Sequence, residues 1–185
     1  LRSVLSQVGY DKSVAIMELD EILRILEGSR AKNIRDPKRY FFTIFGTPSD
    51  AGRWGVSIEG HHLSLNVTMR DGRIVDSTPQ FMGANPAEVK TALPDLPAAG
   101  RRVLELEESV AFDLIRSLDE GQRAKAVIAA EAPREIRGAG EPQPSPEPSV
   151  GIGFGELSAS QQGLLRRLVD VYCETMPEAV ALERR

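Results

Sequence analysis

Two adjacent histidines, His61 and His62, are the residues of this chain whose type is best suited to chemistry. They are the only two histidines among 185 residues, and they precede a segment in which apolar and polar residues alternate. Imidazole has an unperturbed pKa close to neutrality, and histidine is a common metal ligand. The pair therefore marks a candidate site for acid–base or metal chemistry.

The alternation that follows the pair predicts a β-strand with one apolar and one polar face, because successive side chains of a strand point to opposite sides. The apolar face would carry His61, Leu63, Leu65, Val67 and Met69. The polar face would carry His62, Ser64, Asn66, Thr68 and Arg70. We expect the first face to join the core and the second to hold any site.

On the polar face, His62 is the candidate catalytic base, and Ser64 and Asn66 are candidate substrate-binding groups. If the two residues after Glu59 form a tight turn, Glu59 lies opposite His62, where its carboxylate orients the ring or raises its pKa. Glu59 is therefore the second candidate catalytic residue. The alternative is a solvated polar face, which antiparallel sheets commonly present to water.

His61 and His62 are also candidate ligands of a divalent transition metal. Neighbouring side chains of a strand point apart, so the two rings would share one ion only if a turn twisted them together. Further ligands would have to be of other residue types, because the chain has no third histidine. The alternative for His61, on the apolar face, is a hydrogen-bonded core or rim residue.

Composition argues against several classes of function. The net charge of −4 and the lack of a basic region interleaved with aromatic residues do not favour nucleic-acid binding. The single cysteine, Cys173, excludes an intrachain disulfide and a multi-cysteine zinc site. No apolar run reaches the length of a membrane span, and no signal peptide is recognisable. The first residue is not methionine, and helical patterns reach both ends, so we expect an internal fragment of a longer protein.

The pattern predicts an α+β fold. Residues 1–27 have helical spacing, with a break expected at Gly9 and with Asp20 and Glu21 on the side opposite the apolar residues. From about residue 40 to residue 78 the period changes to two, and four runs separated by turns predict a four-stranded antiparallel meander. Helices are expected on both sides of this meander in the sequence.

Later segments predict helices and a linker. Asn85 followed by proline has the pattern of a helix start, and Asn85 is also a candidate substrate-binding residue. Residues 119–122 and 158–161 have the pattern of a capping box, and each follows a leucine. They represent either an internal repeat or two independent helix starts.

A stretch rich in proline and glycine, residues 138–156, predicts a flexible linker. It would divide the chain into a core of helices and sheet, residues 1–137, and a C-terminal helical element, residues 157–185.

The chain resembles an uncharacterised bacterial family, catalogued as domain of unknown function 3500 (DUF3500). The resemblance is carried, in order, by residues 40–48, 54–55, 59–66, 81–89 and 122–128. It implies no established activity. It implies that family members extend further at both ends, with a strand-rich segment containing His and Asp after this chain. Partners of His61 or His62 would then lie outside this sequence.

Three hypotheses follow for the function. The first is an enzyme, metal-dependent and hydrolytic or oxidative, that acts through His62. The second is a non-catalytic module that holds a small molecule or peptide on the same polar face, helped by the loop of residues 81–85. In the third, the two histidines have a purely structural role and fix their turn through hydrogen bonds.

Overall fold

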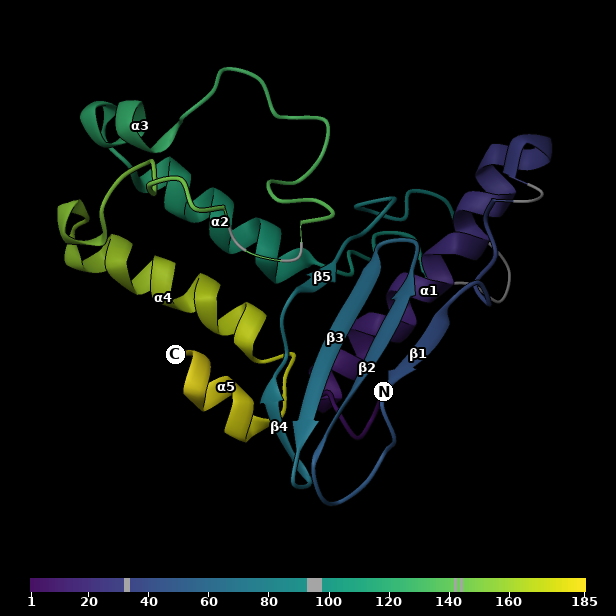
Figure 1. The fold of residues 1–185 in the computed structure, drawn as a ribbon. Coiled ribbons are helices and arrows are strands. Elements are labelled where there is room, and N and C mark those ends of the chain that lie inside the picture. The colour runs from purple at the N-terminus through teal and green to yellow at the C-terminus, as the bar shows by residue number, and fades with distance from the viewer. Residues whose placement is uncertain (32–33, 93–97, 142, 144) are drawn as a thin grey trace. The chain divides into compact units, whose positions relative to one another are not determined.

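The computed structural model describes residues 1–31, 34–92, 98–141, 143 and 145–185. Within these residues the chain forms two compact units. The first combines Leu1–Glu105 with Asp170–Arg185, and the second is Leu106–Val169. The predicted α+β class is confirmed, with five α-helices and one antiparallel sheet (Figure 1).

The sheet belongs to the first unit and confirms the predicted meander. Its strands are β1 (Phe41–Phe45), β2 (Arg53–Gly60), β3 (Leu63–Arg70), β4 (Arg73–Asp76) and β5 (Gln80–Met82). The first four follow one another in space as in sequence, and all pairs are antiparallel. Strand β4 pairs only with the last residues of β3, from Thr68 onward. The short β5, which the sequence did not reveal, pairs with the first part of β3.

Helix α1 (Gln7–Glu27) is continuous, so the break expected at Gly9 is wrong. Ser6 caps the helix by accepting a hydrogen bond from the amide of Gly9, and Gly28, with φ of 59°, ends it. Gly9 has a packing role instead, because a Cβ at this position would lie 2.0 Å from the carbonyl oxygen of Thr175. Only glycine allows the two backbones to approach so closely.

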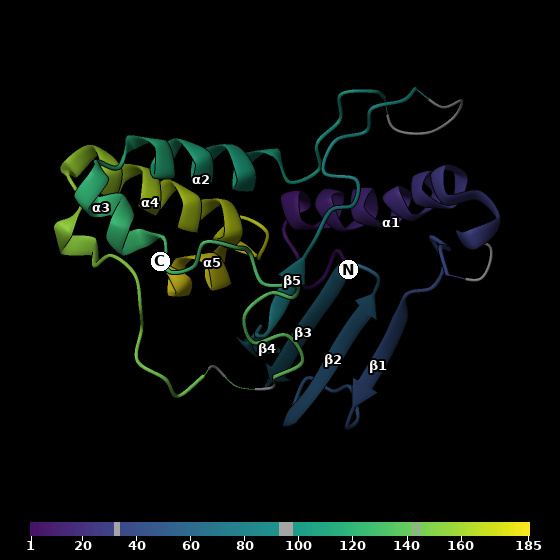
Figure 2. The same cartoon turned by 90° about the horizontal axis from the view of Figure 1, so that it is seen from above.

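The core of this unit lies between α1 and one face of the sheet, as Figure 2 shows. The residues predicted for the apolar face of β3 are buried there, namely Leu63, Leu65 and Val67. They pack in one cluster with Ile58 of β2 and Ile16 of α1. Met69 and His61 were predicted at the two ends of this face. Met69 packs against the cluster, whereas His61 lies before the strand begins.

The helix expected after Asn85 is wrong, because residues 83–92 contain none. Val89 is almost fully buried against Leu19 and Ile22 of α1. Its amide donates to the carbonyl of Arg101, and its carbonyl accepts from the amide of Gly100. A helix would need both of these backbone groups for its own ladder.

The second unit holds most of α2 (Glu105–Ser117), together with α3 (Glu120–Ala126), a short 3₁₀ turn (Phe154–Glu156) and most of α4 (Ala159–Cys173). Both predicted capping boxes form, at Asp119 with Gln122 and at Ser158 with Gln161. The two glutamines also pair with each other, each amide nitrogen donating to the other's oxygen at 3.0 and 2.8 Å.

Of the stretch expected to be a linker, Pro142 and Pro144 lie outside the described residues. The described part before the 3₁₀ turn has neither helix nor strand. The chain ends in α5 (Glu178–Arg184), which belongs to the first unit. None of the helices built from the described residues is long and apolar enough to cross a membrane.

Candidate functional site

The turn between β2 and β3 consists of His61 and His62, because Gly60 pairs with Leu63. The turn therefore lies one residue later than expected, and Glu59 lies opposite Ser64, not opposite His62. The hydroxyl of Ser64 donates to the Glu59 carboxylate at 3.4 Å. The glycine that suggested an earlier turn serves another purpose, since a Cβ at residue 60 would meet the ring of Tyr40 at 2.3 Å.

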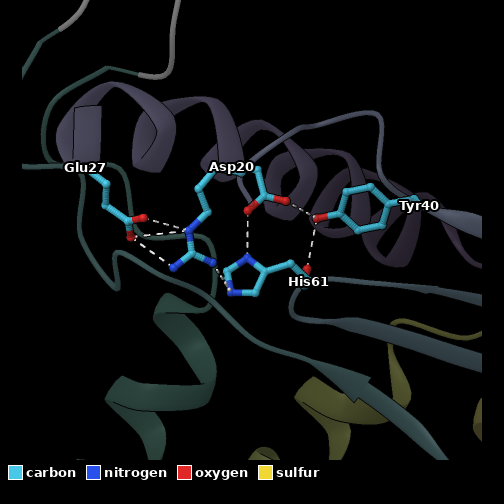
Figure 3. A network of polar contacts seen from close by, with 5 residues as sticks. Asp20, Glu27, Tyr40 and His61 are labelled. Carbon is cyan, nitrogen blue, oxygen red and sulfur yellow. Dashed lines mark hydrogen bonds and ion pairs between the residues drawn. The ribbon is translucent and has the colours of Figure 1, made fainter. Parts of the chain in front are cut away.

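His61 is held by a network of polar contacts that Figure 3 shows from close by. Its Nδ1 lies 2.7 Å from a carboxylate oxygen of Asp20, and its Nε2 lies 3.1 Å from the guanidinium of Arg35. Arg35 in turn forms an ion pair with Glu27 at 2.9 Å. The hydroxyl of Tyr40 lies 3.0 Å from Asp20 and 2.9 Å from the carbonyl oxygen of His61.

Asp20 is the residue of this network that the sequence interpretation placed wrongly. It was expected on the side of α1 away from the apolar residues, but its side chain is only 3 % exposed. A buried carboxylate needs hydrogen-bond donors around it, and His61 and Tyr40 supply them. The signal in the sequence was an acidic residue next to Leu19, one of the apolar residues of the helix.

The contacts determine the protonation pattern of His61. A guanidinium can only donate, so the Nε2 atom next to Arg35 must be the accepting nitrogen, and Nδ1 carries the proton that it donates to Asp20. Burial, reinforced by the Asp20 carboxylate, raises the pKa of Tyr40, which therefore keeps its phenolic proton. Both ring nitrogens of His61 are thus engaged in hydrogen bonds.

His62 is in a different situation. Its ring stacks on that of His61, with 4.0 Å between centroids, and meets Phe81 edge-on at 6.4 Å. The two histidine rings were expected to point apart, but they lie in a turn, where His62 adopts a left-handed backbone with φ of 60°. Within the described part of the chain, neither nitrogen of His62 has a hydrogen-bond partner.

Burial lowers the pKa of His62, and the electrostatic interactions of its ring with His61 and Arg35 act in the same direction. At pH values below 6.5, the ordinary pKa of this side chain, the ring of His62 therefore binds fewer protons in the folded protein than in the unfolded chain. The free energy of unfolding therefore decreases as the pH falls from 6.5 through the lower pKa of the folded state. Above pH 6.5 the residue has no such effect.

We expect the His62→Asn variant to lose less unfolding free energy than the wild type between about pH 7.5 and about pH 5. Asparagine tolerates the left-handed backbone and does not titrate. Urea denaturation of both proteins at both pH values measures this difference. An equal loss in the two proteins would contradict the shifted pKa.

Apart from His62, the described residues place few groups where they could bind a metal ion. Among the described residues, no group of three or more His, Cys, Asp or Glu side chains could hold an ion. A metal shared by both rings would have to displace Arg35 or Asp20 from His61. His62 is the imidazole whose lone pair is available without such a change.

The face of the sheet away from α1 forms a second candidate place, which we call the open face. It carries the alternate residues of the two central strands, including Gly55, Ser57, Glu59, Ser64, Asn66 and Thr68. A hollow of 370 Å³ lies on it, bordered by side chains of Phe45, Arg53, Asn66 and Thr68 and lying over Gly55. The amide nitrogen of Asn66 donates to the carbonyl oxygen of Pro79 at 3.1 Å, which fixes the orientation of this side chain.

Three arginines form a row across one end of the open face. Arg53 of β2 pairs with Arg70 of β3, and Arg70 pairs with Arg73 of β4. Directly paired residues of neighbouring strands point to the same face. All three are exposed, and none forms an ion pair with an acidic residue in the described part of the chain. We call this feature the arginine row.

A protein-family model described as "Protein of unknown function (DUF3500)" matches residues 1–185. The chain belongs to the DUF3500 family. The resemblance carried by its motifs is thereby confirmed. Among curated proteins and among solved structures, no match to this DUF3500 chain is found. Its function has to be inferred from its own geometry.

In this DUF3500 chain the residues singled out from the sequence fall into three places. His61 and His62 form the turn at one end of β3. Ser64 and Asn66 lie on the open face together with Glu59, as the alternation predicted. Asn85 is exposed in a loop and does not border the hollow. The arginine row was missed, because it becomes visible only when the strand register is known.

Proposed function

We propose that this protein binds a small anionic molecule on the open face of its sheet. The observation that carries the proposal is the arginine row, which begins at Arg53 on the border of the hollow. This is a form of the binding-module hypothesis. It moves the expected site along the open face, from His62 to the hollow and the arginine row.

The arrangement of the arginines supports an anionic ligand. Like charges directly opposite each other on neighbouring strands destabilise a sheet. Among the described residues, Asp76 opposite Thr68 is the only acidic residue paired with this part of β3, and its carboxylate accepts hydrogen bonds from Thr78. A carboxylate or phosphate group would neutralise the row, because guanidinium groups bind both through paired hydrogen bonds.

The hollow supports a ligand with an apolar body. Phe45 and Gly55 both line the hollow. Glycine places no side chain there, and a Cβ at this position would lie 3.8 Å from the side chain of Phe45. Thr68 and Asn66 add polar groups beside it. Apolar walls with a few fixed polar groups are characteristic of small-molecule sites.

Phenyl phosphate, benzoate and phenol, added separately to isotope-labelled protein, test this proposal. We expect the two anions to shift the amide resonances of Gly55, Asn66 and Thr68, and we expect phenol, which has the same ring without the charge, to leave them unchanged. A stronger effect of one anion identifies the preferred group. Shifts scattered over both units, or equal shifts with phenol, would contradict the proposal.

A second candidate function is hydrolysis, with His62 as the general base. The proposal includes a metal-assisted form of this reaction. It is supported by a half-buried ring with a lowered pKa and no hydrogen-bond partner for its nitrogens in the described part of the chain. A general base needs an available lone pair at the working pH. Any hydrolytic activity found in a substrate screen should be lost in His62→Asn and kept in Asn85→Ala.

A further inference from the structure

Strand β1 exposes large apolar side chains on both of its faces. Phe42 and Ile44 pair with Ile58 and Val56 and so lie on the side of α1, yet they remain 60 % and 57 % exposed. Phe41 and Phe45 lie on the open face and are 62 % and 59 % exposed. Exposed contiguous apolar surface of this kind marks interaction sites.

The backbone of β1 is also unprotected along its outer edge. Among the described residues β1 pairs only with β2, and Figure 1 shows it at the side of the sheet. The strand contains no proline, no charge and no bulge, which are the devices that normally keep edge strands from pairing.

The opposite edge of the sheet differs in each of these respects. Strand β4 carries the charged residues Arg73 and Asp76, and β5 has three residues. Arg184 of α5 additionally binds the side chain of Gln80 and the carbonyl oxygen of Ser77. Pairing is therefore favoured at β1 alone.

We infer that two copies of this chain pair antiparallel along β1, about a two-fold axis through Thr43. The sequence of the strand, Phe-Phe-Thr-Ile-Phe, has nearly the same pattern in both directions. An antiparallel pairing centred on Thr43 sets Phe41 opposite the partner's Phe45 and Phe42 opposite the partner's Ile44. A symmetric contact requires such self-complementarity, and the pairing uses up both free edges, so that the assembly closes as a dimer.

The dimer would complete the hollow on the open face. Residues directly paired across strands share a face, so the partner's Phe41 lies beside Phe45, which borders the hollow. On the other face, Phe42 and Ile44 of both copies form one apolar cluster that extends the core under α1. The inference goes beyond the proposed ligand and does not depend on it.

Sedimentation equilibrium of the purified protein, wild type and Thr43→Lys, tests the inference. We expect a dimer for the wild type and a dissociation constant at least ~100-fold higher for the variant, because two like charges would meet on the axis. Thr91→Lys, at an exposed position outside the sheet, is the matched control and should leave the dimer intact.

Disulfide trapping checks the register independently of any change in folding. With the buried Cys173 replaced by alanine, Thr43→Cys should form a covalent dimer under mild oxidation, and Thr91→Cys should not. A wild type that stays monomeric, a Thr43→Lys variant that dimerises as tightly as wild type, or equal trapping at both positions would each overturn the inference.

Discussion

Replacing Asp20 by alanine should lower the free energy of unfolding by about 3 kcal/mol. The carboxylate is almost fully buried and accepts hydrogen bonds from the ring of His61 and from the hydroxyl of Tyr40. Hydrogen bonds to charged groups contribute roughly 1.5–3 kcal/mol each, and buried groups left without a partner cost more. Thermal or urea denaturation of the wild type and the variant at neutral pH measures the difference.

Glu21→Ala is the matched control for this experiment. Glu21 is the next residue of the same helix, and it pairs with Arg24 one turn away at the partly exposed surface. Surface pairs of this kind contribute at most about 1 kcal/mol. If Asp20→Ala costs no more than Glu21→Ala, the network does not hold the turn of β2 and β3 on α1.

The network determines where the ring of His62 lies. Because Asp20 and Arg35 fix both nitrogens of His61, the stacked ring of His62 is held next to Phe81 at the end of the open face. His61 thus makes hydrogen bonds through both of its ring nitrogens. The ring nitrogens of His62 have no hydrogen-bond partner among the described residues.

Local patterns predicted the sheet well. The alternation of β3 identified Leu63 and Leu65 as core residues, because burial on one face repeats every second residue. Asp71 and Gly72 form the turn between β3 and β4, one of the turns that separate the predicted runs, with positive φ at both residues. These features depend on neighbours in the sequence, which is why periodicity was sufficient.

Features that depend on distant contacts were not predictable in this way. Gly9 and Gly60 suggested a break and a turn, but each makes room for a residue from another part of the chain, Thr175 and Tyr40. Asp20, the hydrogen-bond partner of His61 Nδ1, lies 41 positions away in the sequence. Glycine has several structural uses, and sequence alone does not distinguish them.

The arginine row shows how a small error in the position of a turn hides a cluster of charge. With a turn at residues 60 and 61, Arg53 would lie opposite Thr68, and only Arg70 and Arg73 would lie opposite each other. With the turn at the two histidines, Arg53 lies opposite Arg70. A shift of one residue in the turn moves every cross-strand pair by two positions.

The most direct test of the central claim compares the affinity of phenyl phosphate for the wild type and for the Arg53→Gln/Arg70→Gln variant. Both affinities are measured by calorimetry at low salt. Arg134→Gln/Arg137→Gln, which removes the same charge from exposed positions in the second unit, is the control. Loss of charge-assisted hydrogen bonds should weaken binding about 10- to 100-fold in the first variant and leave the control unchanged. Equal affinity in the wild type and the Arg53/Arg70 variant would contradict an anion site on the open face.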